Sequence, residues 1–127
     1  MVLGHPVEHP ETVATAIRIG NPASWQGAIE AARDSLGSIR SVTDEEILYA
    51  YRLLARTEGL MVEPACAAPL AGLIKCVQAG EIPEGSLVTA TMTGHGLKDP
   101  DRAIEVAGFQ PIVVPATRDA VIAAIGL

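Results

Sequence analysis

The sequence contains few residues of several kinds, and each shortage excludes a class of protein. It has only two lysines, Lys75 and Lys98, and a net charge of -6. Such a chain has no basic stripe with which to neutralise a phosphate backbone, so we predict that it does not bind nucleic acid. No apolar run approaches the roughly 18 residues that a membrane span needs. The first ten residues lack the basic start and apolar block of a secretion signal, so we expect a cytoplasmic protein that binds no membrane.

Cysteine and histidine are also scarce. Cys66 and Cys76 stand ten residues apart without a second pair, which fits neither a disulfide framework nor a zinc knuckle. We expect both to be reduced thiols, buried as small apolar groups. His5 and His9 have the spacing of helical metal ligands, but each is followed by a proline that disfavours a helix. We therefore predict no metal site.

What is present is enough apolar sequence for a core. The chain has 127 residues, of which 49% are hydrophobic and 19% charged. No internal repeat or linker divides it, so we expect a single domain over residues 1–127.

Two helices have clear start signals. Asn21 is a good N-cap before a helix over residues 22–36, and Gly37 suits a left-handed end. Thr43 and Glu46 form a capping box that starts the next helix. An alanine-rich helix then follows Glu63-Pro64 and ends at Gly80. Further helices are expected over residues 101–107 and from Thr117, the last one with these side chains facing inward: Val121, Ile122 and Ile125.

Short apolar segments between the helices indicate strands. Residues 60–62 fit a short apolar strand, and residues 87–92 have the composition of a parallel strand covered on both faces. Residues 38–42 fit either a half-covered strand or a lead into the next helix, and residues 10–20 fit a short helix or a turn into a strand. Helices that alternate with buried strands predict an α/β fold, with helices layered around a short, mostly parallel sheet.

A glycine-rich stretch after the strand at 87–92 is the first candidate site, because ligands gather beyond the carboxyl ends of parallel strands. Residues 93–96 read Thr-Gly-His-Gly, but Asp99 stands where a dinucleotide fingerprint needs its third glycine. The chain also has no Gly-Lys-Ser/Thr of a Walker loop. Spacing alone favours a strand-to-helix turn capped by Asp99 and Asp101. Glu63 is either a general base or a cap for the helix after it, and on its own the cap is favoured.

Three runs carry a family resemblance: PETVATAIRIGNPASW, TDEEILYAYRLLARTEGLMVEPACAAPLAGLIK and TGHGLKDP, in this order. Over about residues 5–102 the chain resembles the C-terminal third of threonine synthase, a fold type II pyridoxal-phosphate enzyme related to tryptophan synthase β. The resemblance implies part of the larger domain of such an enzyme. The implied activity is that of a lyase of threonine biosynthesis, which converts O-phospho-L-homoserine and water to L-threonine and phosphate.

The resemblance also implies what this chain does not carry. The Schiff-base lysine and the glycine-rich phosphate loop of the family lie upstream of the matched region, and neither Lys75 nor Lys98 matches the Schiff-base position. We therefore expect no catalytic residue in this chain and no turnover by the chain alone.

Four cofactor-binding residues are implied by position. Thr93 matches the family's threonine that places its hydroxyl against the ring nitrogen of pyridoxal phosphate, where a neutral hydroxyl can donate to an unprotonated nitrogen. Gly94 is small enough for the backbone to pass the ring edge, and Ala16 matches another close approach. Glu63 matches a glutamate beside the cofactor pocket. Cys66 stands where many relatives have serine, so any polar role of that position is in question.

The alternative is a truncated, non-enzymatic α/β module. A sheet that is cut from a larger one leaves an edge and an apolar face uncovered. Such a module would self-associate, for example as a homodimer, or pair with a separate N-terminal half.

Overall fold

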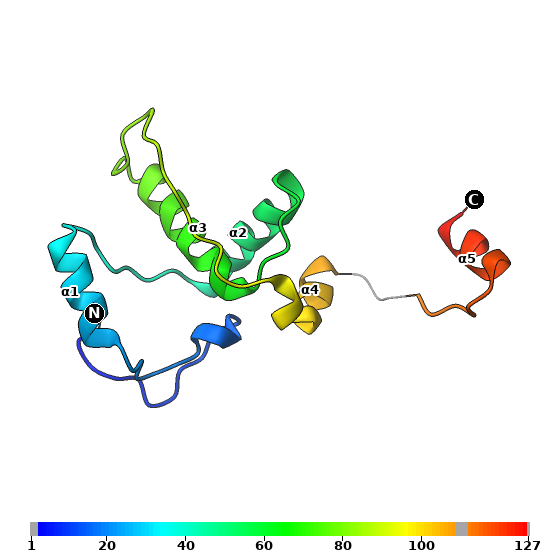
Figure 1. Cartoon of the computed structure of the whole chain (residues 1–127), viewed down its shortest axis with the longest axis horizontal. Coiled ribbons are helices and arrows are strands. Elements are labelled where there is room, and N and C mark those ends of the chain that lie inside the picture. The colour runs from blue at the N-terminus through cyan, green and yellow to red at the C-terminus, as the bar shows by residue number, and fades with distance from the viewer. Residues whose placement is uncertain (1–2, 109–111, 127) are drawn as a thin grey trace.

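The computed structural model describes residues 3–108 and 112–126, which form helices joined by long coil segments (Figure 1). The elements in chain order are η1 (Thr15–Ile17), α1 (Trp25–Asp34), α2 (Asp44–Thr57), α3 (Pro64–Gln78), η2 (Gly96–Lys98), α4 (Pro100–Ala107) and α5 (Arg118–Ile125). No helix in these described ranges is long and apolar enough to cross a membrane.

The capping box at the start of α2 is confirmed. The Glu46 backbone N–H donates to Thr43 Oγ1 at 3.2 Å, and the Thr43 N–H donates to Glu46 Oε2 at 2.7 Å. These bonds satisfy two of the donors that a helix start leaves free. Two interactions lower the pKa of the Glu46 carboxylate. The larger is the hydrogen bond from the Thr43 backbone N–H, and the second is the contact with Lys75. The start of α2 is therefore fixed by local chemistry that is visible in the sequence.

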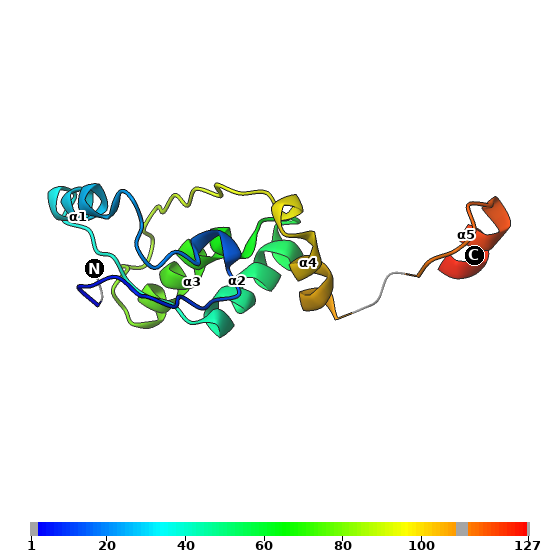
Figure 2. The ribbon, with the colours of Figure 1, turned by 90° about the horizontal axis from the view of Figure 1, so that it is seen from below.

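Helix α3 is also confirmed, and it packs against α2. Pro64 stands in its first turn, where the missing N–H costs nothing, and Gly80 follows its end with φ +70°. Figures 1 and 2 show the two helices next to each other. Small side chains let them approach closely. The buried core lies mainly between them and consists of Ala14, Ile47, Ala50, Tyr51, Leu54, Val62, Cys66, Ala67 and Ala71.

The predicted sheet is absent from the described residues, so the α/β expectation is wrong for this structure. Residues 87–92 run as coil between the end of α3 and η2 (Figure 2), and Leu87 is 97% exposed. Of residues 60–62, Val62 forms one isolated antiparallel bridge with His95. A buried parallel strand needs neighbours on both sides and covered faces. The described part of the chain supplies neither to the 87–92 segment.

The outer helices follow their local signals only in part. α1 is capped at Ser24 rather than Asn21, and the left-handed position falls on Leu36 (φ 54°) rather than Gly37. α4 forms as predicted, with Asp99 Oδ1 accepting from the Arg102 N–H at 3.3 Å.

Helix α5 forms from the predicted start but does not bury the predicted face. The Thr117 hydroxyl caps it by accepting from the Ala120 N–H at 3.4 Å. Figures 1 and 2 both show α5 apart from the other helices. Val121 and Ile125 are exposed, so the expectation that they face inward is wrong. A cap requires only neighbouring residues, whereas burial requires a surface to pack on.

Candidate functional site

The turn at residues 93–96 is held against the segment that leads into α3. The Glu63 N–H donates to the Gly94 carbonyl at 3.1 Å, and the Gly96 N–H donates to the Met61 carbonyl at 3.0 Å. Between these two bonds lies the bridge of Val62 with His95. The turn therefore sits at the N-terminal end of α3, although 27 or more residues separate the two segments in sequence.

Thr93 presents its hydroxyl at the edge of this turn. The residue is exposed, and its Oγ1 lies 3.2 Å from Cys66 Sγ on the first turn of α3. The same sulfur accepts the Gly94 N–H at 2.7 Å. Cys66 is 2% exposed, so the expected burial of this thiol is confirmed. The buried thiol thus contacts the hydroxyl of an exposed residue.

Glu63 is the buried charge of the site. It is 7% exposed, and its Oε1 accepts from Lys98 Nζ at 3.0 Å and lies 3.9 Å from Cys66 Sγ. It occupies the N-cap position of α3, as predicted, although its side chain makes no capping bond. A Cβ at Gly94 would lie 1.9 Å from Glu63 Oε1, so a larger residue here would require the Glu63 side chain to move.

Ala16 lies in η1, on an exposed stretch that a hydrogen bond ties to the region after the turn. Its neighbour Thr15 donates from Oγ1 to Asp99 Oδ2 at 3.2 Å. The structure therefore brings Thr93, Gly94 and Glu63 together. It places η1 beside Asp99, at the start of α4.

The surroundings of Asp99 are partly desolvated. Burial raises the pKa of the Tyr51 phenol, and the negative charge of Asp99 raises it further. Tyr51 is 8% exposed and belongs to the core between α2 and α3. Asp99, at the start of α4, therefore lies near the core as well as near solvent.

His95 has a local structural contact. Its Nδ1 accepts the Leu97 N–H at 3.1 Å, which caps η2 at the next residues. Within residues 3–108 and 112–126 no group of three or more histidine, cysteine, aspartate or glutamate side chains could hold a metal ion.

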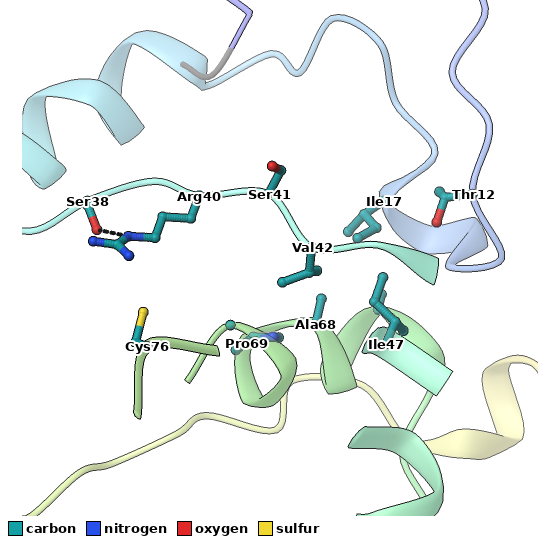
Figure 3. A pocket seen from close by; sticks show the side chains of 12 residues that line it. Thr12, Ile17, Ser38, Arg40, Ser41, Val42, Ile47, Ala68, Pro69 and Cys76 are labelled. Atoms are coloured by element: carbon teal, nitrogen blue, oxygen red, sulfur yellow. Dashed lines mark hydrogen bonds between the residues drawn. The ribbon is translucent and has the colours of Figure 1, made fainter. Parts of the chain in front are cut away.

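A cavity of about 650 Å³ lies between α3 and the coil before α2 (Figure 3). Val42 and Ala68 face each other across it, and Cys76, which is only half-buried, lies at one end. The lining consists of Thr12, Ile17, Ser38, Arg40, Ser41, Val42, Ile47, Ala65, Ala68, Pro69, Gly72 and Cys76. Ile17 and Ala65 line the cavity, and they are the sequence neighbours of Ala16 and Cys66. η1 and α3 therefore contribute residues both to the cavity and to the candidate site.

Lys98 is the member of the cluster that sequence reasoning missed. It stands 35 residues from Glu63, and no periodicity joins the two. The available signal was its scarcity, since Lys98 is one of two lysines and lies five residues after Thr93.

The comparisons with known proteins agree on one enzyme class. A family model described as "Pyridoxal-phosphate dependent enzyme" matches residues 3–94. Threonine synthase of Mycobacterium leprae is 56% identical over 121 residues, which are 95% of this chain and 33% of that protein. Threonine synthase of Bacillus sp. strain ULM1 is 62% identical over 82% of this chain and 30% of that protein. Threonine synthase of Methanosarcina acetivorans is 54% identical over 91% of this chain and 28% of that protein.

The chain therefore spans about a third of the length of the curated relatives that it matches. The family model covers the segment that contains η1, α2, α3 and the first two residues of the turn. This chain belongs to the family of pyridoxal-phosphate dependent enzymes.

Proposed function

We propose that this chain is the C-terminal part of a threonine synthase, a cytoplasmic lyase that converts O-phospho-L-homoserine and water to L-threonine and phosphate. The proposal is supported by identities of 54–62% to proteins named threonine synthase. The observation that carries it is the position of Thr93, an exposed residue on a turn that is held against α3, with its hydroxyl on Cys66.

The residues at the turn fit the ring end of pyridoxal phosphate. Thr93 is an exposed residue with a neutral hydroxyl, and a neutral hydroxyl can donate to an unprotonated pyridine nitrogen. Gly94 has no side chain that could project past the hydroxyl, and its backbone is fixed by Cys66 and Glu63. Pyridoxal phosphate, when bound, supplies an electron sink for negative charge on a substrate carbon. The role of this chain is then to hold and orient one edge of the ring.

Glu63 and Ala16 complete this edge in the proposal. Glu63 fills the space behind Gly94 and prevents the turn from collapsing into it. Ala16 offers a small side chain on η1, which the bond from Thr15 to Asp99 holds near the start of α4. The catalytic lysine and the phosphate-binding loop would come from the part of the enzyme that the matched relatives have in addition.

Complementation tests this proposal. The purified chain is mixed with pyridoxal phosphate and O-phospho-L-homoserine, with and without the remaining N-terminal part of the Mycobacterium leprae relative, and released phosphate is measured. We expect phosphate only when both parts are present, and at least a tenfold lower rate for Thr93→Val, because one hydrogen bond to the ring is lost. Thr91→Val is the control, since Thr91 is an exposed threonine two residues earlier.

Two results would contradict the proposal. Phosphate release by the chain alone would show that turnover does not require the N-terminal part of the enzyme. Equal rates for Thr93→Val and Thr91→Val in the complemented enzyme would remove Thr93 from the site.

A second candidate function is that of a module that associates with another chain without catalysis. The accessible surface of the chain is 9463 Å², whereas a compact monomer of 13.2 kDa exposes about 6,400 Å². The excess is comparable to the area of an obligate interface. This excess of exposed surface favours association with a partner chain, which is either a second copy or a separate N-terminal half.

A further inference from the structure

The ion pair between Glu63 and Lys98 lies beside the candidate site without being part of its expected chemistry. The Glu63 side chain is 8% exposed and the Lys98 side chain is 60% exposed, and Nζ lies 3.0 Å from Oε1. The pair therefore joins a buried carboxylate to an ammonium group at the surface. A buried carboxylate without a partner is strongly unfavourable, so Lys98 has an electrostatic role at this turn.

The buried carboxylate is close enough to act on the Thr93 hydroxyl. Cys66 Sγ lies 3.9 Å from Glu63 Oε1 and 3.2 Å from Thr93 Oγ1. The two oxygens are thus separated by no more than about 7 Å, a range at which a full charge in a partly buried site acts strongly. A group bound to Thr93 would sense the carboxylate if the ammonium did not balance it.

Other ionisable groups around the turn have contacts of their own. Cys66, from α3, accepts the Gly94 N–H. His95, which caps η2, accepts the Leu97 N–H and is exposed. Asp99, at the start of α4, accepts from the Thr15 hydroxyl and the Arg102 N–H. Glu63 and Lys98 are paired across the turn, whereas Asp99 keeps its negative charge one residue after Lys98.

We propose that Lys98 is a specificity-determining residue of the cofactor site. It neutralises Glu63, so that Thr93 donates its hydrogen bond to a ring nitrogen that carries no proton. This inference rests on the proposed function. An unbalanced carboxylate would hold a proton on the ring nitrogen and deepen the electron sink, which changes which bonds of a substrate break. The pair acts through its charge and does not itself touch the ring.

The test measures protonation of the ring nitrogen directly. Pyridoxamine 5′-phosphate labelled with ¹⁵N in the ring is bound to the chain complemented with the N-terminal part of the Mycobacterium leprae relative, and its ¹⁵N chemical shift is followed as a function of pH. We expect Lys98→Met to raise the pKa of the bound ring nitrogen by about one unit, and Glu63→Gln to lower it by a similar amount. The double variant should return to the wild-type value, and Lys98→Arg should retain it.

The pattern of variants separates charge from structure. A variant that merely loosens the turn would weaken binding without shifts of opposite sign, and circular dichroism checks that the helices remain. Lys75→Met is the matched control, because Lys75 pairs with Glu46 on the exposed side of α2 and α3. Lys75→Met should leave the pKa of the bound ring nitrogen unchanged.

The outcomes distinguish the inference from the proposed function. If the complemented wild-type enzyme does not bind the probe, or binds it equally well after Thr93→Val, the proposed site is wrong and the inference falls with it. If Thr93→Val weakens binding at least tenfold but Lys98→Met and Glu63→Gln shift the pKa in the same direction or not at all, the inference alone is overturned.

Discussion

At Gly94 a single methyl group would clash with the Glu63 side chain. A Cβ there would lie 1.9 Å from Glu63 Oε1 and 2.4 Å from its Cδ, and the Glu63 side chain is held by Lys98. We therefore expect Gly94→Ala to lower the free energy of unfolding by about 1–3 kcal/mol, because the buried carboxylate must move away from its partner. Urea denaturation followed by circular dichroism measures this.

Gly27→Ala is the matched control for this substitution. Gly27 lies inside α1, and a Cβ there meets nothing within 4 Å. Alanine at this position should leave stability unchanged or raise it by about 0.5–1 kcal/mol, since it restricts the unfolded chain. If both substitutions had the same effect, the close packing of Glu63 against Gly94 would be disproved.

The site could be predicted from the sequence only through the family resemblance. Spacing alone favoured a plain turn at residues 93–96, because hydrogen bonds within the turn do not reveal what lies across from it. Thr93 and Cys66 meet over 27 residues of sequence, and Glu63 and Lys98 over 35. Contacts of this kind depend on how the chain returns to α3, and no local rule supplies that information.

Among the elements, those with local signals formed and those without them did not. The starts of α2, α4 and α5 were predicted from capping residues that act within three positions. The strand over residues 87–92 was predicted from composition, but a strand is stabilised by neighbouring strands. Residues 3–108 and 112–126 provide no such neighbour to it.

Caps at the starts of α2 and α5 should differ in their effect on stability. Thr43→Ala removes the hydroxyl half of the capping box of a helix that forms the core, and we expect a loss of about 1 kcal/mol of unfolding free energy. Thr117→Ala removes the side-chain cap of α5, which lies apart from that core, so cooperative unfolding should not change. Denaturation curves of the two variants measure the difference.

The pH dependence provides a second check on α2. Because the pKa of Glu46 is lowered in the folded chain, its contribution is present above the ordinary value of 4.5 and is lost as the pH falls through the lowered value. The difference in unfolding free energy between wild type and Glu46→Gln should therefore shrink in acid, because the Glu46 carboxylate accepts from the backbone N–H of Thr43. A difference that stayed constant with pH would contradict the reciprocal capping box.

At the scale of the whole molecule, the exposed surface is too large for a self-sufficient domain. The chain exposes 9463 Å², against about 6,400 Å² for a compact monomer of its mass. The coil over residues 87–92 contributes to this excess, and its backbone groups are open to pairing. An unpaired apolar segment of this kind is a template for addition of another strand.

We therefore expect the purified chain to form dimers or larger assemblies through residues 87–92. Leu87→Lys places a charge on a side chain that is 97% exposed, and it should shift the assembly towards monomer by at least tenfold in dissociation constant, without loss of helix. Leu36→Lys is the control, because Leu36 is 95% exposed but follows α1. Light scattering coupled to size exclusion gives the masses. A compact wild-type monomer, or equal effects of the two substitutions, would show that the segment does not mediate association.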